Sequence, residues 1–296
     1  TVKYFHPYLA YREIDWDRAL IKAIPKVNAA NTPKDYQNAI DQLLAVLNDK
    51  STRVEIEANT KEAASKATEA KPVRTENGTL IIEATRVAQA VAKDITALNG
   101  FATSITQAIQ NSGSVIIDAR GTGKLTELEA YHFENFMRQT LTGMLDTTVT
   151  LASTRYRMHN GYATQTGGGA SFYYSALVNS APQTITGRSK TKTPPIAFII
   201  NEHSPSFADV LSGLQSTGRA VVIQEGEPPA AATFTIDLPD NIKVRMRTGE
   251  LVNADGSIDL QPDTIVAKAT IEDALKALKE TRTPKRNTAP AALKTV

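Results

Sequence analysis

A serine that follows an apolar run and opens a helical stretch is the first candidate for chemistry in this sequence. Ser206 comes after PIAFIIN (195–201) and before apolar residues at helical spacing, Phe207, Val210, Leu211 and Leu214. A hydroxyl at such a strand-to-helix junction lies at the mouth of a sheet, where the helix N-terminus favours a developing negative charge. This is how a nucleophile is presented. Ser206 and Asp209 also have the spacing of a capping box, so a helix cap is the alternative role.

Two glycines after another apolar run form the second candidate element. Gly121 and Gly123 follow SVIIDA (114–119), and glycine allows backbone N–H groups to approach an anion closely. A plain turn is the alternative. The loop is not a phosphate-binding Walker A motif, because Asp118 stands where the first glycine belongs and Leu125 replaces the required Ser or Thr.

The histidines are the candidates for a general base or a metal site. The chain has four of them, His6, His132, His159 and His203. They lack a metal-ligand spacing such as HExxH, so no zinc site is expected. His203 shortly precedes Ser206, and His159 lies in the RYRMHNGY stretch. Either could act as a base, while a surface or hydrogen-bonded structural histidine is the alternative for both.

Composition excludes several classes of function. Lys and Arg number 33 against 31 Asp and Glu, so a formal charge of +2 provides no basic field for nucleic acid or an anionic membrane. No apolar run reaches the roughly 20 residues of a membrane span, and the start, Thr1-Val2-Lys3-Tyr4, is no signal peptide. The absence of Cys removes disulfides, thiolate metal sites and cysteine nucleophiles. With 41% hydrophobic residues, the 296-residue chain has the apolar material for a sizeable core.

Three short apolar runs predict a buried, mostly parallel sheet. They are SVIIDA (114–119), PIAFIIN (195–201) and RAVVIQE (219–225). The last two flank a helical stretch, in strand-helix-strand order. Parallel strands place the loops at their carboxyl ends along one edge, where sites form in open α/β sheets. We therefore expect the loops Gly121 to Gly123 and Glu225 to Pro229 to line the same cleft as Ser206.

The remaining patterns predict the elements around this sheet. Residues 11–49 read as a helical hairpin, with Thr32 as the N-cap of its second helix. Residues 86–112 carry an apolar stripe that predicts one long helix, bent at Gly100. The other expected elements are a strand over 78–84, an edge strand over 147–158, a late hairpin from 233–238 and 243–247, a helix over 271–281 and a basic tail after it.

The order and spacing of several segments resemble those of the C-terminal-processing (tail-specific) and tricorn-type serine peptidases over about residues 11–266. The segments that carry the resemblance are DWDRAL (15–20), LLAVLNDKSTRVE (43–55), GTLIIEA with the helix after it, VIIDARGTG (115–123), NEHSPSFADVLSGLQSTGRAVVIQEGE (201–227) and DGSIDLQPD (255–263). It implies an α/β fold, a crotonase-like core with a buried, mostly parallel sheet preceded by a small helical N-terminal domain. The expected division is a helical domain 1–57, a linker or flap 58–77, the core 78–268, and a C-terminal helix and tail 269–296.

The resemblance also implies roles for particular residues. Ser206 falls where the family has its nucleophile. The backbone N–H of Phe207, together with that of Gly121 or Gly123, would form the oxyanion hole.

The general base is not identified by the family pattern. Tail-specific members carry a lysine in a loop after a Gly-Glu motif, but here Glu225-Gly226-Glu227 continues into prolines and alanines. Tricorn-like members use a histidine where this chain has Asp49-Lys50-Ser51-Thr52, and a glutamate where it has Gly256-Ser257. By position, the candidates for the base are His203, His159 and Lys124, the last because it follows the expected oxyanion loop.

The leading hypothesis is a peptidase-like serine hydrolase that cleaves peptide bonds by acyl transfer through Ser206. Its substrate would be a peptide or protein, no cofactor is expected, and the resemblance implies a periplasmic or extracytoplasmic location. We expect no nucleic acid partner and no membrane span, and the sequence does not indicate an oligomeric state. About 20 residues separate the strands at Arg53 and Gly78, too few for the PDZ module of many relatives.

Two other functions remain open from the sequence. A missing base costs roughly 10²–10⁴-fold in rate, so the chain could be a catalytically impaired relative that binds peptides or serves as an assembly module. An acyl-CoA hydratase or isomerase is suggested by fold analogy alone.

Overall fold

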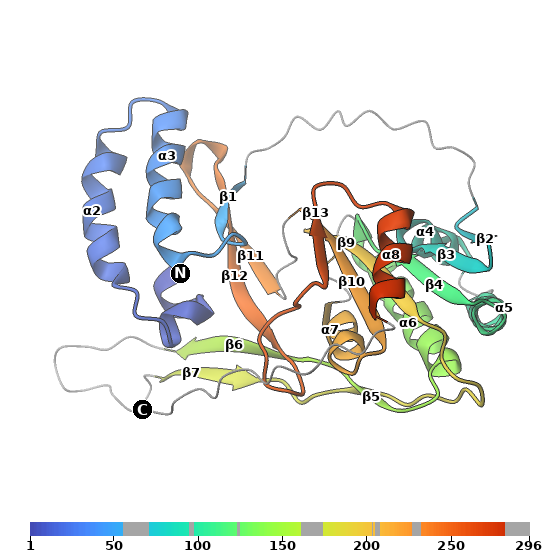
Figure 1. The fold of residues 1–296 in the computed structure, drawn as a ribbon. Coiled ribbons are helices and arrows are strands. Elements are labelled where there is room, and N and C mark those ends of the chain that lie inside the picture. The colour runs from blue at the N-terminus through green and yellow to red at the C-terminus, as the bar shows by residue number, and fades with distance from the viewer. Residues whose placement is uncertain are drawn as a thin grey trace.

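The structure is a computed structural model, and it describes residues 1–55, 71–94, 98–122, 125–160, 174–202, 204, 208–226 and 232–281. The described part is a mixed α/β arrangement built on two main sheets (Figure 1). A six-stranded sheet forms the centre of one half, and a five-stranded sheet lies between it and the N-terminal helices. None of the described helices is both long and apolar enough to cross a membrane.

The six-stranded sheet has the strand order β13-β10-β9-β4-β3-β2. Its strands are β2 (Val73–Glu76), β3 (Thr79–Glu83), β4 (Ser114–Asp118), β9 (Ile196–Asn201), β10 (Ala220–Glu225) and β13 (Thr264–Val266). All neighbours pair in parallel except β2, which is antiparallel to β3. Because helices cover both faces, the central strands are continuous apolar runs, and Ile116, Ile117 and Phe198 are at most 1% exposed. The predicted buried, mostly parallel sheet is confirmed.

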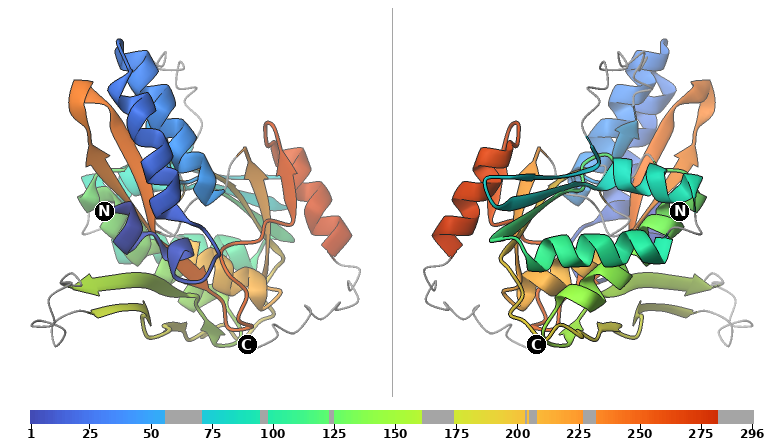
Figure 2. Two further views of the ribbon diagram at one scale, coloured as in Figure 1. Left: turned by 90° about the vertical axis from the view of Figure 1, so that its left-hand side faces the viewer. Right: turned by 90° about the vertical axis from the view of Figure 1, so that its right-hand side faces the viewer.

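Helices cover both faces of this sheet (Figure 2). Alternate residues of its strands pack against one helical layer or the other. Ile117 and Phe198 pack in a large core with α4 (Ala84–Lys93), α5 (Leu98–Gln110), α6 (Glu127–Met144) and α7 (Ala208–Ser216). Ile116 and Ile199 point to the opposite face, where they pack against α8 (Ile271–Thr281). The period of two residues along each strand thus distributes the apolar side chains between both layers.

The helices differ from the sequence prediction at two places. The single helix expected over 86–112 is two helices, because α4 ends at Lys93 and Asp94 adopts an extended φ of −141°. Both helices pack on the same face, so one continuous apolar stripe does not reveal the break. The long helix α6 was not predicted. Its buried side includes the polar His132 and Thr140, while Leu128 and Tyr131 are each 62% exposed, which obscures its helical period.

The second sheet runs β1-β12-β6-β7, with β11 also paired to β12. Its strands are β1 (Arg53–Glu55), β6 (Ser153–Asn160), β7 (Tyr174–Asn179), β11 (Ala232–Asp237) and β12 (Lys243–Val252). The late hairpin is confirmed as β11 and β12, joined through a short helix over Pro239–Asn241. The edge strand predicted over 147–158 is wrong, because β6 lies between β12 and β7. Residues Val149–Thr150 form a separate strand, β5, paired with β8 (Thr184–Ile185).

The N-terminal residues form the predicted helical hairpin and three shorter helices. The elements are α1 (Val2–Phe5), a 3-10 helix Pro7–Ala10, α2 (Trp16–Asn28), α3 (Pro33–Leu44) and a 3-10 helix Ala45–Leu47. Thr32 caps α3 in a capping box with Asp35, as its spacing predicted. The hairpin does not form a core by itself, since Trp16 and Leu43 share an apolar cluster with Val244 of β12. Strand β2 falls within the stretch predicted as a linker or flap, whose residues 56–70 lie outside the described ranges.

Candidate active site

The loops after β4, β9 and β10 meet at one edge of the six-stranded sheet. Arg120, which follows β4, donates from Nη1 to Glu225 Oε2 at the end of β10, at 2.7 Å and 105 residues away in sequence. The Gly121 N–H points to Asn201 Oδ1 at the end of β9, at 3.5 Å. The loops after β4 and β10 therefore meet at one edge of the sheet. The cleft that they are expected to share with Ser206 stays a prediction, because Ser206 lies outside the described residues. Residues 123 and 227–229 of the same prediction lie outside the described ranges.

Arg120 is the centre of the contacts that hold this edge together. It donates to Asp118 from Nε at 2.9 Å and from Nη2 at 2.6 Å, and from Nη1 to the Ala269 carbonyl at 3.1 Å. The hydrogen bonds with Asp118 raise the pKa of Arg120, although burial opposes them. For Glu225, burial raises the pKa of the carboxyl. The Ala269 N–H and the Arg120 guanidinium lower this pKa by more, so the net shift is downward. These groups stay charged near neutral pH, and the cluster is a clamp between loops.

Ser204 fixes the start of the segment that follows β9. Its side chain is fully buried, and its Oγ donates to the Ala119 carbonyl at 2.8 Å. The same Oγ accepts from the Asn201 N–H at 3.1 Å. A buried hydroxyl with a donor and an acceptor satisfied in this way is a structural group. Ser204 thereby attaches the β9 loop to the β4 loop.

The residues predicted from the sequence to act in catalysis divide into two groups. Ser206, Phe207, Gly123, Lys124 and His203 lie outside the described residues. Of the two that are described, Gly121 lies at the strand-end edge and has a φ of +76°, a conformation that favours glycine. His159 lies on β6 in the other sheet, where its ring stacks on Tyr4 with the ring centroids 4.1 Å apart. The structure brings Gly121, but not His159, to the ends of β9 and β10.

Two cavities open at this edge of the sheet. The first, here called the β4 cavity, has a volume of about 520 Å³ and is lined by Glu83, Thr85, Arg86, Gln89, Asp118, Arg120, Gly121, Leu125 and Glu129. The second, the β10 cavity, has a volume of about 430 Å³ and is lined by Tyr8, Asn48, Asp49, Lys50, Ser51, Gln224, Gly226, Arg247, Asp259, Leu260, Gln261, Pro262 and Ile265. Strand β9 lies between β4 and β10, so the two cavities flank its end.

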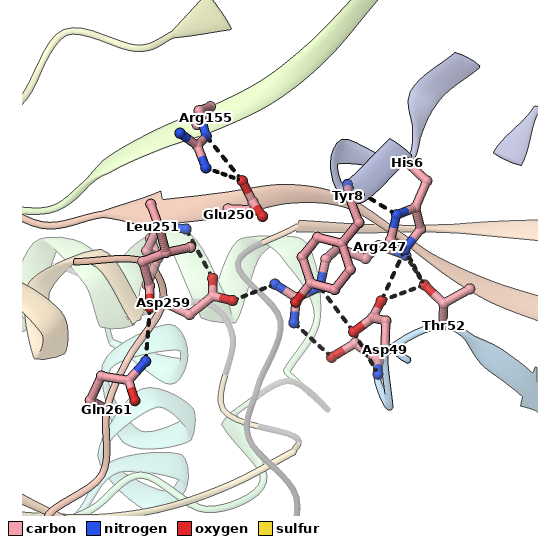
Figure 3. Close-up of polar contacts among 12 residues, drawn as sticks. His6, Tyr8, Asp49, Thr52, Arg155, Arg247, Glu250, Leu251, Asp259 and Gln261 are labelled. Carbon is pink, nitrogen blue, oxygen red and sulfur yellow. Dashed lines mark hydrogen bonds and ion pairs between the residues drawn. The ribbon is translucent and has the colours of Figure 1, made fainter. Parts of the chain in front are cut away.

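A buried polar network forms one wall of the β10 cavity (Figure 3). Arg247 is 5% exposed and donates to Asp49 Oδ1 at 3.2 Å and to Asp259 Oδ2 at 2.7 Å. Burial raises the pKa of Asp49, but the hydrogen bond with His6 and the Arg247 guanidinium outweigh it and hold the pKa well below its usual range. Sequence reasoning missed this network, because Arg247 and Asp49 are 198 residues apart and neither belongs to a local motif.

His6 completes the network from the N-terminal segment. It is fully buried, and its Nδ1 accepts from the Tyr8 N–H at 3.3 Å, so the ring proton is on Nε2. Nε2 lies 3.1 Å from both Asp49 Oδ2 and Thr52 Oγ1. His6 therefore supports Asp49 and has a structural role.

A further ion pair connects the N-terminal part to the strand-end edge. Arg53 of β1 donates from Nη2 to Oε2 of Glu202, the residue after β9, at 2.5 Å. The segment before β1, Asn48 to Ser51, lines the β10 cavity. The helical part of the chain thus contributes one side of the candidate site.

No protein-family model matches the chain, and a search of curated proteins finds no significant match. The fold is similar to the crystal structure of a presumed peptidase from Parabacteroides merdae ATCC 43184, with a TM-score of 0.51 and 13% identity over 93% of this chain and 89% of that chain. Weaker likenesses are to a lipoprotein from Streptococcus agalactiae (TM-score 0.47, 13% identity, 95% of this chain and 92% of that one) and to the photosystem II D1 C-terminal processing protease (TM-score 0.43, 11% identity, 98% and 96%). The chain thus has a mixed α/β, peptidase-like fold.

Proposed function

We propose that the protein is a serine-type peptidase that acts by acyl transfer through Ser206. The observation that carries the proposal is the meeting of the β4, β9 and β10 loops at one edge of a parallel sheet. In the sequence, Ser206 stands between Ser204, which is anchored to that edge, and Ala208, where α7 begins. A hydroxyl between those two points is suited to attack a carbonyl group bound at the edge.

In the proposed reaction, the Ser206 Oγ attacks a peptide carbonyl while a general base removes its proton. The backbone N–H groups of Phe207 and Gly123 stabilise the oxyanion. Gly123 is preferred to Gly121 because the Gly121 N–H already points to Asn201 Oδ1. The amine leaves with a proton, and water then hydrolyses the acyl-enzyme.

His203 and Lys124 are the base candidates that we carry forward. His159 is set aside, because its ring stacks on Tyr4 in the other sheet. A histidine base predicts that kcat/KM falls as pH drops through about 6.5. A lysine base has to be neutral. The fall of kcat/KM at low pH would then follow a lysine pKa that burial has lowered from about 10.4.

Two further observations support this proposal. The sequence resembles the tail-specific and tricorn-type serine peptidases in the segments before and after Ser206, which implies a crotonase-like core and an extracytoplasmic location. The fold is similar to that of the presumed peptidase from Parabacteroides merdae.

A fluorophosphonate probe tests the proposal directly, since it labels activated serines. We expect labelling of the unmodified protein, its loss in Ser206→Ala and its retention in Ser216→Ala. Ser216 is a matched control at the end of α7, where its hydroxyl donates to the Gly213 carbonyl at 3.1 Å. Labelling that persists in Ser206→Ala, or labelling absent from the unmodified protein, contradicts the proposal.

A catalytically impaired, peptide-binding relative is the second candidate. The observation in its favour is that Asp49 and Thr52, at the position of the tricorn-type histidine, are both engaged in the buried network with His6. Peptide binding without probe labelling distinguishes this candidate from the peptidase.

A further inference from the structure

Gln224 lines the β10 cavity and has a side-chain acceptor with no partner among the described residues. Gln224 is 1% exposed, and its Nε2 donates to the Gly226 carbonyl at 2.7 Å, which fixes the orientation of the amide. Its Oε1 is buried and accepts no hydrogen bond from any residue that the structure describes. Buried acceptors are normally paired, so a ligand that brings an N–H to this oxygen is favoured.

Unused donors lie in the same cavity. A guanidinium has five N–H donors, and Arg247 directs three of them to Asp49, Asp259 and Ser51, counting acceptors among the described residues. The Ser51 Oγ accepts from Arg247, which leaves its own O–H to donate. The cavity therefore offers an acceptor and donors together.

The described residues of the cavity wall carry no net formal charge, which favours a neutral ligand. Arg247 and Lys50 are balanced by Asp49 and Asp259, so the formal charges of the lining residues cancel. The described residues also hold no group of three His, Cys, Asp or Glu side chains that would bind a metal ion. A neutral group with one donor and one acceptor fits these properties, and a peptide amide is such a group.

The position of the β10 cavity relative to the β4 cavity suits an extended peptide. The β4 and β10 cavities flank the end of β9, and strands two positions apart in a sheet are about 10 Å apart. About three extended residues cover that distance. A peptide lying across the end of β9 would therefore reach both cavities.

We infer that the β10 cavity binds a backbone amide of a peptide substrate, with Gln224 Oε1 accepting the peptide N–H and Arg247 or Ser51 donating to the peptide carbonyl. This inference rests on the proposed function for the identity of the ligand as a substrate. It makes Gln224 a specificity-determining residue that requires an N–H at one position beside the scissile bond. An N-alkylated residue such as proline is excluded there.

Backbone N-methylation tests the inference, because it deletes one peptide N–H at a time. Synthetic decapeptides tiling β-casein are screened for binding to the full-length Ser206→Ala protein, and the tightest binder is resynthesised with each amide methylated in turn. We expect methylation at one position to weaken binding about 3- to 10-fold, the effect of one neutral hydrogen bond. In Ser206→Ala/Gln224→Met, methylation at that position should cost nothing. A purely structural role of Gln224 would instead weaken all the peptides alike.

A second pair of variants keeps the inference testable if Gln224→Met does not fold. Ile265 lines the cavity and is 65% exposed, so Ile265→Trp fills the cavity mouth without disturbing the core. Ile21, on α2, is 67% exposed and outside the cavity, which makes Ile21→Trp the matched control. We expect Ile265→Trp to weaken peptide binding at least about tenfold and Ile21→Trp to leave it unchanged.

The outcomes separate this inference from the proposed function. Equal binding by the two Trp variants, a methylation cost that persists in Gln224→Met, or no binding by any decapeptide overturns the inference. Probe labelling of Ser206 without a methylation cost leaves the peptidase standing and the amide site wrong. A methylation cost that depends on Gln224, without labelling of Ser206, leaves the amide site standing and the peptidase wrong.

Discussion

Gly213 of α7 packs directly against Leu151. A Cβ at Gly213 would lie 2.8 Å from the Leu151 Cα and 2.7 Å from the Thr150 carbonyl oxygen. Both atoms belong to the backbone, which moves less readily than a side chain. Glycine thus lets the helix that follows Ser206 approach the segment after β5.

Gly213→Ala is therefore expected to lower the free energy of unfolding by about 1–3 kcal/mol through overpacking. Gly100→Ala is the matched control, since Gly100 is exposed in α5 with no atom within 4 Å of its added Cβ. There the substitution should stabilise by about 0.5–1 kcal/mol. Denaturant unfolding of both variants measures the difference. Equal changes in the unfolding free energy of the two variants would mean that α7 can move away from Leu151.

Arg120→Met tests the clamp between the loops. Its side chain is 28% exposed and makes ion pairs with Asp118 and Glu225, so its loss should cost about 1–3 kcal/mol and reduce probe labelling of Ser206. Arg219 is also 28% exposed and pairs with Asp146, but it precedes β10 at the opposite edge of the sheet. Arg219→Met should lower stability without reducing labelling. The same loss of labelling in both variants would argue against the clamp.

Ser204 and Ser206 are expected to separate stability from reactivity. Ser204→Ala removes a buried hydroxyl bonded to Ala119 and Asn201, so it should lower stability by about 1–3 kcal/mol. Ser206→Ala should abolish labelling at a cost of about 1 kcal/mol, the value of a helix cap. Thermal melts beside the labelling assay measure both. A large stability loss in Ser206→Ala would indicate that its hydroxyl is mainly structural.

Asp49 is expected to make stability depend on acid pH. The pKa of its carboxyl is lower in the folded than in the unfolded chain, so it stabilises above its unfolded pKa of about 3.9 and loses this effect as pH falls through the folded value. Asp49→Asn should be less stable at pH 7 by about 1–3 kcal/mol, because among the described residues it leaves Asp259 as the one carboxylate partner of the buried Arg247 guanidinium. The difference from the unmodified protein should shrink between about pH 4 and pH 2. Urea unfolding at each pH checks this, and a constant difference would contradict it.

Much of the central sheet could be predicted from the sequence, because its strands carry local signals. Runs such as SVIIDA and PIAFIIN have continuous apolar centres, since both of their faces are covered. Thr32 marks the start of α3 with a capping box. The interior position of β6 was missed because it depends on pairing with β12, 95 residues away at Arg155 and Glu250. Such pairing leaves no trace in the strand's own pattern.

The candidate site could be predicted in part for the same reason. Arg120 and Gly121 follow β4, and Glu225 ends β10. The parallel order of these strands is predictable, so the meeting of the two loops followed from topology. The cavity beside β10 could not be predicted, because Gln224, Arg247 and Asp49 come from distant parts of the chain. Gln224 also lies inside an apolar run, and the sequence of that run does not reveal that its Oε1 has no partner among the residues that the structure describes.

The apolar cluster shared by Trp16, Leu43 and Val244 has a consequence for how the protein is made. The first helices leave the ribosome long before Ile242 and Val244 have been added, so their buried face stays incomplete while most of the chain is translated. Strands β2, β3, β4, β9 and β10 of the six-stranded sheet precede Ile242 in the sequence, so they can pair earlier, as each one emerges. The segment synthesised first is thus among the last to finish packing, and a nascent chain stalled before Ile242 would present Trp16 and Leu43 to molecular chaperones.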